Sequence, residues 1–472
     1  MSRINTNISS IQAMHRLIGN QQDLSLRLER LSSGLRINRG RDDPAGLIAS
    51  ESLRSEITGL NQAIENSTRA VNVISTAEGS LNEVSALLLE MRGLINKSAN
   101  EGALSPQEIE ANQLQIDSIL ASIDRVANTT QFNGVKLLNG SLDYVLSADK
   151  NNFADIHVYG ANIPEGSYQD VMVEVKASAK VAQYKWTHSA LAANESVTLQ
   201  ITGNKGSQIV SFAASTTASQ MKQTINSYKD LTGVSATCSG ARGALILSSV
   251  GYGASAYVSV TPIAQNTTSA FDEDTKYGVN PDVRVNGQEA TSDGLVATIR
   301  SGGLDLELTF DAAFAGGINT DTFRIKGGGA LFQLGPDVRA TGQYRMGIQS
   351  VHTGRLGNAE VGRLSEIGRG GSASIVGKNY EQAQRIVDVA IQQVATLRGR
   401  LGGFQKNQLE TNINSQRIAL ENVKASESAI RDADYATETA AMTRAQILVQ
   451  STTQILAMAN QQPQNVLSLL GR

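Results

Sequence analysis

Residues 57–95 read ITGLNQAIENSTRAVNVISTAEGSLNEVSALLLEMRGLI, and their apolar side chains recur every three or four residues. That spacing places one apolar stripe along one side of an α-helix. The stripe consists of Ile57, Leu60, Ile64, Val71, Ile74, Leu81, Val84, Leu88, Met91 and Ile95. Ser67 and Glu78 interrupt it. We predict one helix from about 46 to 98, roughly 80 Å long at ~1.5 Å per residue, a length typical of coiled-coil packing.

Helical patterns continue on both sides of this helix. Upstream, a further stripe consists of Leu24, Leu28, Leu31 and Leu35. Downstream, Ser105-Pro106-Gln107-Glu108 combines a capping box with proline at the first helical position. The helix that it opens carries a stripe of Ile109, Ile116, Ile119, Ile123 and Val126.

The end of the sequence mirrors its beginning. One stripe consists of Ile386, Ala390, Val394, Leu397 and Leu401, and its continuation of Leu409, Ile413, Leu420, Val423 and Ile430. We predict a last helix from about Tyr435 to Asn460, which Pro463 ends. Single helices cannot bury such stripes alone, so we expect the two chain ends to pack on each other.

The middle of the chain has a different composition. Residues 132–344 hold 18 of the 21 aromatic residues, and residues 1–131 hold none. Apolar and polar residues alternate here, as in 196–201, 257–260 and 304–308, which predicts strands. Phe132-Asn133-Gly134 and Leu138-Asn139-Gly140 carry hairpin signals, and one helix is expected near 217–229. We therefore predict an α+β fold: a long α-helical coiled coil made from both termini, with a β-rich central insertion.

Composition and charge exclude several classes of protein. The chain has 472 residues and a formal net charge of −3, which gives no general attraction to nucleic acid or to an anionic membrane. Cys238 is the single cysteine, so no intrachain disulfide is possible. No run approaches the ~18 apolar residues of a membrane span. The start, MSRINTNISS, lacks the apolar stretch of a secretory signal peptide, so we expect no export by the general secretory route.

Catalytic and metal-binding patterns are also absent from the sequence. It contains no H-E-x-x-H motif, no G-x-S-x-G elbow and no phosphate-binding loop. The acidic pair Asp42-Asp43 precedes Pro44 as at a helix start, and Asp432 and Asp434 fall between two predicted helices. We expect no catalytic residue, no metal, no cofactor and no enzymatic activity.

Both termini resemble bacterial flagellin. The matching motifs are Ile4–Asn7, Arg30–Asn38 (RLSSGLRIN), Asp42–Leu47 (DDPAGL), Gln131–Gly134 (QFNG), Leu397–Gly402 (LRGRLG), Ile430–Ala436 (IRDADYA) and Ala459–Leu470 (ANQQPQNVLSLL). Residues 195–262 are similar to the flagellin hook IN motif. That similarity rests on Thr224-Ile225-Asn226, Thr232–Ala236 and Leu245–Ser249.

The resemblance implies a layered filament subunit for swimming motility. Residues 1–45 and 430–472 would be inner-core helices, 46–140 N-terminal rod helices with a hairpin, 345–429 a C-terminal rod helix, and 141–344 β-rich outer domains. The family is exported unfolded through the flagellum's own type III channel and forms an extracellular helical homopolymer. Its implied partners are further copies of itself, an export chaperone at the C-terminal segment, the filament cap and hook-associated proteins, with no nucleic acid and no membrane insertion.

The resemblance also implies roles for particular residues. Self-assembly of the inner core would use Leu24, Leu28, Leu31, Leu35, Leu456, Val466, Leu467 and Leu470. The rod coiled coil would use Ile64, Val71, Ile74, Leu81, Leu88, Ile95, Val394, Leu397 and Leu401. An innate-immune Toll-like receptor reads an Arg, a Leu and a Glu on the rod of many flagellins. Here those positions are Glu90, Leu94 and Gln115, so we expect weak activation of that receptor.

Two alternatives remain open at this stage. A hook–filament junction protein has similar ends, and the full Ala459–Leu470 tail and the large insertion favour the filament subunit over it. A flagellin whose outer domain adds adhesin or enzymatic activity is the other alternative, and the lack of any catalytic set argues against an enzyme.

Overall fold

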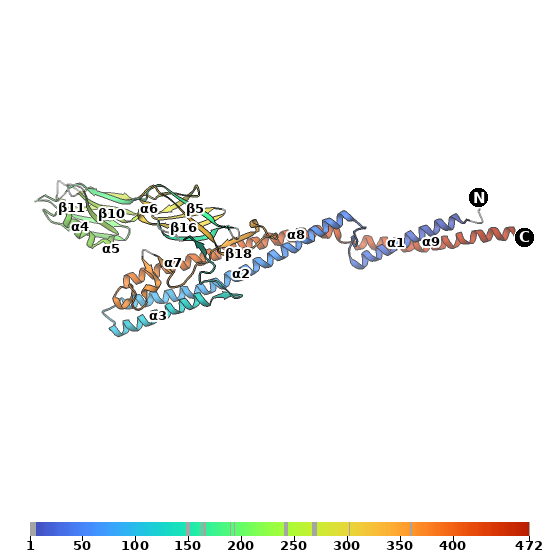
Figure 1. Ribbon diagram of the computed structural model, residues 1–472, viewed down its shortest axis with the longest axis horizontal. Helices are drawn as coiled ribbons and strands as arrows, with labels where there is room; N and C mark the ends of the chain where they lie inside the picture. Colours follow the sequence, from blue (N-terminus) through green and yellow to red (C-terminus); the bar gives the residue numbers. More distant parts are fainter. Residues whose placement is uncertain are drawn as a thin grey trace. The chain divides into compact units, whose positions relative to one another are not determined.

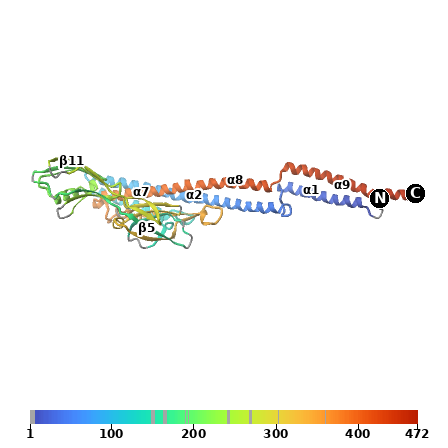
Figure 2. The same cartoon turned by 90° about the horizontal axis from the view of Figure 1, so that it is seen from above.

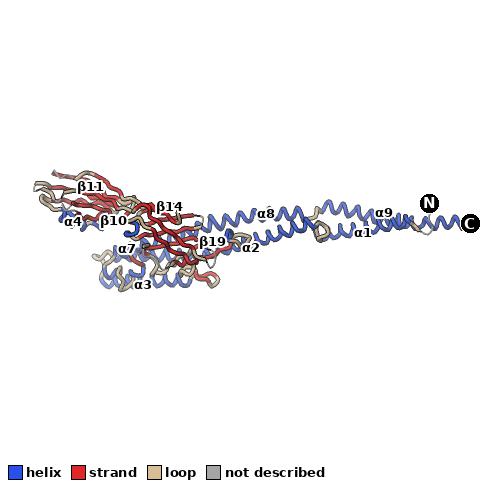
Figure 3. Tube along the Cα trace, turned by 45° about the horizontal axis from the view of Figure 1, so that its top comes forward, coloured by secondary structure: helices blue, strands red, loops and turns tan. Residues whose placement is uncertain are grey.

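A computed structural model describes residues 6–147, 152–161, 163, 167–188, 190–192, 194–239, 244–266, 271–301, 303–358 and 361–471, with the backbone alone at 266 and 463–470. Helices occupy both ends of the sequence and strands its middle (Figure 1, Figure 3), so the predicted fold class is confirmed. The chain divides into two compact units. The first comprises Met1–Arg69, Gln333–Gly342 and Lys406–Arg472, and the second Ala70–Phe332 and Gln343–Gln405.

The first unit pairs the two ends of the chain. Helix α1 (Ile8–Ser33) lies beside α9 (Tyr435–Leu470), and the start of α2 (Pro44–Ser98) lies beside α8 (Thr411–Arg431) (Figure 2). The helices of both chain ends are interrupted at the same position along the pair: α1 ends at Ser33 before α2, and α8 ends at Arg431 before α9. Gly34 adopts a left-handed conformation with φ of 73°, and its carbonyl accepts a 2.9 Å hydrogen bond from the amide of Ala433. Two matched breaks therefore hold the helix pairs in one register.

Helix α9 corrects the sequence prediction, because it continues past Asn460 through Pro463 to Leu470. A proline inside a helix lacks the N–H that would bond the carbonyl four residues earlier, here that of Ala459. The side-chain amide of Asn7 donates to this carbonyl instead, at 2.6 Å. A residue from the opposite end of the chain thus satisfies the acceptor that Pro463 leaves free.

A segment from the middle of the chain belongs to the first unit. Residues Gln333–Gly342 lie against α2 and α8, where a Cβ added at Gly59 would meet Pro336 at 3.2 Å. The side-chain amides of Asn412 and Gln416 both donate to the carbonyl of Leu334. A π-helical turn, Gln405–Glu410, precedes α8.

In the second unit, the part of α2 from Ala70 onward packs with α3 (Pro106–Thr129), where Asn112 bonds Ser98, and with α7 (Tyr380–Phe404), where Asp388 pairs with Arg92. The predicted capping box of α3 is confirmed: Ser105 Oγ accepts from the amide of Glu108, and the Glu108 carboxylate accepts from the amide of Ser105 at 2.7 Å. Most buried positions of α2 follow a three-four spacing. The buried positions with this spacing are Leu60, Ala63, Ser67, Ala70, Ile74, Ala77, Leu81, Val84, Leu88, Met91 and Ile95, and Ser50, Leu94 and Ser98 are buried as well.

One predicted hairpin is confirmed and the other is wrong. Strands β1 (Gln131–Phe132) and β2 (Val135–Lys136) pair around Asn133 and Gly134, both with positive φ as a tight hairpin turn requires. Residues 138–140 form a turn that joins no paired strands, because β2 pairs with β1 whereas the next strand pairs with β17. The side chain of Asn139 accepts from the amide of Ser141 there.

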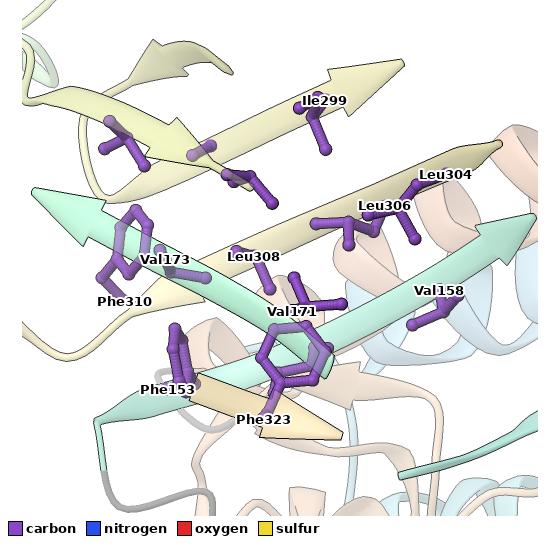
Figure 4. Close-up of a cluster of buried hydrophobic side chains, with 14 of the residues drawn as sticks. Phe153, Val158, Val171, Val173, Ile299, Leu304, Leu306, Leu308, Phe310 and Phe323 are labelled. Carbon is purple, nitrogen blue, oxygen red and sulfur yellow. The ribbon is translucent and has the colours of Figure 1, made fainter. Parts of the chain in front are cut away.

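The first β-domain is built on an eight-stranded sheet of order β3-β17-β5-β13-β14-β15-β16-β4. Phe153, Phe310 and Phe323 point toward one another and toward valines of β5 in its core (Figure 4). The short helix α6 (Ala312–Ala315) adds Phe314. The strands are β3 (Tyr144–Leu146), β4 (Phe153–Ala161), β5 (Gln169–Ala177), β13 (Asp282–Val285), β14 (Gln288–Asp293), β15 (Val296–Ser301), β16 (Leu304–Phe310) and β17 (Thr320–Gly328).

The second β-domain, inserted between β5 and β13, has its own core. A three-stranded sheet, β6-β10-β9, packs with a four-stranded sheet, β12-β11-β7-β8, and with α4 (Ala218–Ser227) and α5 (Lys229–Thr232). The helix expected near 217–229 is therefore present, with Thr217 as its N-cap. The strands are β6 (Val181–Trp186), β7 (Ser196–Gly203), β8 (Gly206–Phe212), β9 (Val234–Ser239), β10 (Ala244–Tyr252), β11 (Tyr257–Asn266) and β12 (Asp274–Tyr277).

Short elements connect the β-domains to α7. Strand β18 (Ala330–Gln333) pairs with β19 (Gln343–Met346), and β20 (Gly357–Asn358) with β21 (Gly362–Arg363). The 3-10 turns are Ala340–Gly342, Leu364–Ile367 and Ile375–Gly377. Buried Gln113 of α3 holds this region: its side chain donates to the carbonyl of Ile367 and accepts from Ser374 Oγ and the amide of Ile375.

Candidate assembly interface

Small side chains line the contact between α1 and α9. Ala13 of α1 and Ala445, Thr452 and Ala459 of α9 are buried in the pair. The α9 positions are seven residues apart, which is a coiled-coil repeat. Because these side chains are short, the two helices meet through few large apolar groups. Of the larger apolar side chains, Leu24, Leu31 and Leu456 are half-buried, and others of both helices are exposed.

A charged cluster joins the end of α1 to the start of α9. Glu438 of α9 is buried, and its carboxylate accepts from Arg27 Nη1 at 2.9 Å and from Arg30 Nη1 at 3.1 Å. Burial alone would raise the pKa of Glu438, but the hydrogen bonds and positive charges of Arg27 and Arg30 outweigh it, so the pKa is lowered. The same hydrogen bond to Glu438 raises the pKa of Arg27. This cluster therefore fixes the axial position of α1 relative to α9.

Polar contacts extend along the rest of the pair. Ser10 Oγ lies 2.6 Å from Asn460 Oδ1, and Asn20 Nδ2 lies 3.4 Å from Thr452 Oγ1. The Asn7 side chain caps α1 by accepting from the amide of Ser10, in addition to its bond with α9. The α1–α9 contact therefore combines polar groups and small buried residues with leucines that are only half-buried.

Large apolar side chains of α1 and α9 face solvent. They are between 42% and 62% exposed in the isolated chain, far more than core residues. We call this set the terminal apolar surface; it consists of Ile8, Ile11, Met14, Ile18, Ile447, Leu448, Ile455 and Met458. Contiguous apolar surface of this kind marks a site of protein–protein contact.

The residues predicted for inner-core assembly are placed unevenly. Leu24, Leu31, Leu35 and Leu456 are half-buried within the first unit, whereas Leu28 is exposed. The side chains of Val466, Leu467 and Leu470 lie outside the described residues. Sequence reasoning missed the terminal apolar surface, although Ile8, Ile11 and Ile18 already follow helical spacing.

The residues predicted for the rod coiled coil lie along α2 and α7. On α2 the fully buried ones are Ile74, Leu81, Leu88 and Ile95. On α7, Leu401 is fully buried, and Val394 and Leu397 are almost fully buried. Ile64 and Val71 are half-buried beside the seam, whose positions there are Ala63 and Ala70. Ser67 is also part of the seam, and its hydroxyl accepts from the side-chain amide of Asn412 at 3.3 Å.

The three positions aligned with an immune-receptor surface lie on neighbouring helices. Gln115 Nε2 of α3 donates to Glu90 Oε1 of α2 at 3.0 Å. Leu94 is buried between the helices, whereas Leu89 and Leu114 are about half exposed. Arg92 pairs with Asp388 of α7 at 3.2 Å. Glu90 and Gln115 thus form a hydrogen bond with each other between α2 and α3.

One member of each acidic pair caps a helix. Asp43 Oδ1 accepts from the amide of Gly46 at the start of α2, and Asp434 Oδ1 from the amides of Ala436 and Thr437 at the start of α9. The side-chain and backbone hydrogen bonds from Thr437 and that from Ala436 lower the pKa of Asp434. Within the described ranges, no three His, Cys, Asp or Glu side chains gather as a metal site would require.

Among the described helices, none is long and apolar enough to cross a membrane.

Three family profiles match the chain. They are described as the bacterial flagellin N-terminal helical region, over residues 4–143, the bacterial flagellin C-terminal helical region, over 384–470, and the flagellin hook IN motif, over 198–251.

Full-length relatives carry the same description. Flagellin of Salmonella rubislaw is 31% identical over 517 aligned residues, covering 99% of both chains. Flagellin B of Vibrio cholerae is 29% identical, also over 99% of both chains. Among solved structures, the flagellar junction protein of Legionella pneumophila aligns with 81% of this chain and 99% of its own, at 13% identity and a TM-score of 0.29.

Proposed function

The chain belongs to the bacterial flagellins, the structural subunits of the flagellar filament, and we propose that it polymerises by burying the terminal apolar surface between neighbouring subunits. The observation that carries the proposal is the arrangement of α1 and α9. The fully buried positions of their mutual contact are small or polar residues, and the eight large apolar side chains of the terminal apolar surface remain exposed. Burial of apolar area contributes about 25 cal/mol per Å², so each subunit added to a filament gains from covering them.

The proposed contact is head-to-tail. A surface that meets a different surface of the next copy does not close on itself, and repeated contacts of this kind generate a helical polymer. We assign residues 1–45 and 430–472 to the inner core of the filament, 46–140 and 345–429 to the rod, and 141–344 to the outer domains. Leu24, Leu28, Leu31, Leu35, Leu456, Val466, Leu467 and Leu470 act with the terminal apolar surface in the inner core.

The C-terminal segment also has the features of a chaperone ligand. Helix α9 presents Ile447, Ile455 and Met458 on an exposed side, and an amphipathic helix docks readily into an apolar groove. We propose that an export chaperone covers this side before assembly, and that the subunit leaves the cell through the channel of the flagellum. The cap and hook-associated proteins are proposed as its partners at the filament ends.

The alternatives receive less support. The flagellin relatives match this chain over its whole length, which favours the filament subunit over a hook–filament junction protein. We propose that the outer domains have no enzymatic activity. The number of copies in each flagellum distinguishes a filament subunit from a junction protein, because a filament subunit is abundant and a junction protein is present in few copies.

Seeded polymerisation of the purified chain tests the proposed function. Short filament fragments are mixed with full-length monomer or with a chain lacking residues 433–472, and the products are pelleted and viewed by negative-stain microscopy. We expect long uniform filaments from the full-length chain alone. Filaments from the truncated chain would contradict a role of α9 in assembly, and absence of filaments from both would contradict the proposed function.

We also propose that the monomer activates the innate-immune receptor weakly. Glu90 has the opposite charge to the family's Arg and is already bonded to Gln115, and Leu94 is buried. A cell reporter assay compares the chain with Glu90→Arg/Gln115→Glu. A strong response to the unaltered chain would contradict the proposal.

A further inference from the structure

The hook IN motif takes no part in the proposed assembly contact. Its residues Ile225 and Asn226 lie near the end of helix α4, which packs beside strand β9 in the second β-domain. Strand β9 is at the edge of the three-stranded sheet β6-β10-β9, so it has a strand partner on one side only. The other side of an edge strand presents N–H and C=O groups that can pair with a strand of another chain.

The side chain of Asn226 bonds the backbone of this edge strand. Asn226 Nδ2 donates to the carbonyl of Ala236 at 3.0 Å, and Asn226 Oδ1 accepts from the amide of Ala236 at 2.8 Å. In an antiparallel strand the N–H and C=O of one residue point to the same side. Both groups of Ala236 bond Asn226, so Ala236 faces the open edge. The carboxamide of Asn226 therefore occupies the place that the backbone of a further strand would take.

The preceding outward position of β9 has a side-chain partner as well. Outward positions alternate along a strand, so Val234 faces the same edge as Ala236. The amide of Val234 donates at 3.2 Å to Oγ1 of Thr232, the buried last residue of α5. Gly233 between them has a φ of 73°, a left-handed conformation that ends α5 and leads the chain into β9. Two successive outward positions are thus bonded by side chains.

Ile225 and Asn226 have complementary roles in this arrangement. Ile225 is buried in the core of the domain with Met221 of the same helix, and it holds α4 against the sheet. Asn226, the next residue, then reaches the edge of the strand. A carboxamide offers both an acceptor and a donor, as a peptide group does, whereas an aspartate has no donor. The Ile-Asn pair therefore combines a core anchor with a substitute for a neighbouring strand.

We propose that the hook IN motif closes the β9 edge and so prevents this strand from pairing with a strand of another copy of the chain. Natural β-sheet proteins cover their edges with helices, loops or charged side chains, because open edges lead to association. In this domain the cover is a helix whose carboxamide bonds the strand itself. The inference goes beyond the proposed function, because it concerns the free chain and does not require the filament.

Sedimentation velocity of the unseeded full-length chain tests this inference. Asn226→Ala removes both hydrogen bonds, and alanine is the best helix former, so α4 is expected to remain. We expect this variant to form dimers and larger oligomers at several times the fraction found for the unaltered chain, because the β9 edge is then open.

Asn204→Ala is the matched control. Asn204 also bonds two backbone groups, since it donates to the carbonyl of Ser255 and accepts from the amide of Tyr257. It joins the β7–β8 turn to the start of β11, and β7 and β11 already pair with each other. Its loss therefore opens no strand edge, and we expect the oligomer fraction of the unaltered chain.

A second substitution separates edge pairing from a loss of stability. Thr237→Lys places a charge on an exposed position of β9 without restoring the hydrogen bonds, and lysine on an edge strand opposes pairing. We expect Asn226→Ala/Thr237→Lys to return to the oligomer fraction of the unaltered chain, while its melting temperature stays no higher than that of Asn226→Ala. If Asn226→Ala does not fold, Asn226→Ser gives the same test, because its hydroxyl is too short to bond both groups of Ala236.

Three results would overturn the inference. The first is a variant at Asn226 that keeps its circular dichroism spectrum and sediments as the unaltered chain does. The second is an equal oligomer fraction from Asn204→Ala, which would indicate a general loss of stability. The third is association that Thr237→Lys leaves unchanged. None of these measurements requires filaments, so a failure of the proposed function would not affect them.

Discussion

At the scale of single residues, Glu438 is the side chain on which the pairing of the chain ends depends most. It accepts hydrogen bonds from Arg27 and Arg30 while almost fully buried. We expect Glu438→Gln to destabilise the α1–α9 pair by about 1.5–3 kcal/mol, the range for hydrogen bonds to charged groups. Thermal melting followed by circular dichroism measures the loss. Glu29→Gln, which breaks an exposed pair with Arg39, is the control and is expected to change little.

The same residue predicts a dependence on pH. The pKa of Glu438 is lowered in the folded chain, so its contribution is complete above the unfolded value of about 4.3. It is lost as the pH falls through the folded pKa. We therefore expect the unaltered chain to melt at a higher temperature than Glu438→Gln near pH 7. This difference is expected to shrink below about pH 4. A difference that persists in acid would contradict this assignment.

Individual residues also mark the limit of prediction from sequence. The helix start at Asp43 and the capping box at Ser105 were predicted, because a cap depends on residues within one turn. Pro463 misled the prediction, because the group that compensates for its missing N–H is Asn7, more than 450 residues away. Tertiary partners of this kind leave no local signal.

At the scale of elements, the end of α9 gives a coupled prediction. If Asn7 replaces the N–H that Pro463 lacks, Asn7→Ala destabilises the end of α9 more in the unaltered chain than in the Pro463→Ala chain. In the latter, the N–H of residue 463 can bond the Ala459 carbonyl itself. We expect a coupling of about 1 kcal/mol, typical of residues that share a partner. Hydrogen exchange of the α9 amides in a double-mutant cycle measures it, and additive effects would contradict the account.

The rod helices give a second prediction at this scale. Leu81 is fully buried in the seam of α2, whereas Leu89 on the same helix is about half exposed. We expect Leu81→Ala to lower the free energy of unfolding by about 2–5 kcal/mol, and Leu89→Ala to change it by less than about 0.5 kcal/mol. Chemical denaturation distinguishes them. Equal effects would mean that the seam does not carry the stability of the rod.

Periodicity explains which elements the sequence predicted. Along α2 it identified the helix and most of the seam, including Ile74, Leu81 and Leu88. It assigned Ile64 and Val71 to the stripe where Ala63 and Ala70 are buried, because hydrophobicity alone ranks isoleucine and valine above alanine. In a closely packed seam, however, the small side chain fits.

At the scale of the whole molecule, the sequence predicted helical ends and a β-rich middle from the distribution of aromatic residues and the change in apolar spacing. It could not predict the strand order of the eight-stranded sheet, in which β5 pairs with β13 and β17. Alternation identifies a strand and its inward face, but it does not identify the neighbour. The terminal apolar surface was missed for a related reason, since only the structure separates side chains that α1 and α9 bury from those that they expose.

The critical concentration for seeded polymerisation tests most directly whether this surface drives assembly. Ile18→Ala and Ile455→Ala each remove one member of it, and Ile318→Ala removes an exposed side chain from the β-rich region as the control. Ile18 and Ile455 are 42% and 50% exposed, so burying the exposed half of either isoleucine contributes about 1 kcal/mol. Each of the first two variants is therefore expected to raise the critical concentration several-fold, and the control to leave it unchanged. Unchanged critical concentrations in all three, or an equal rise in the control, would contradict the account.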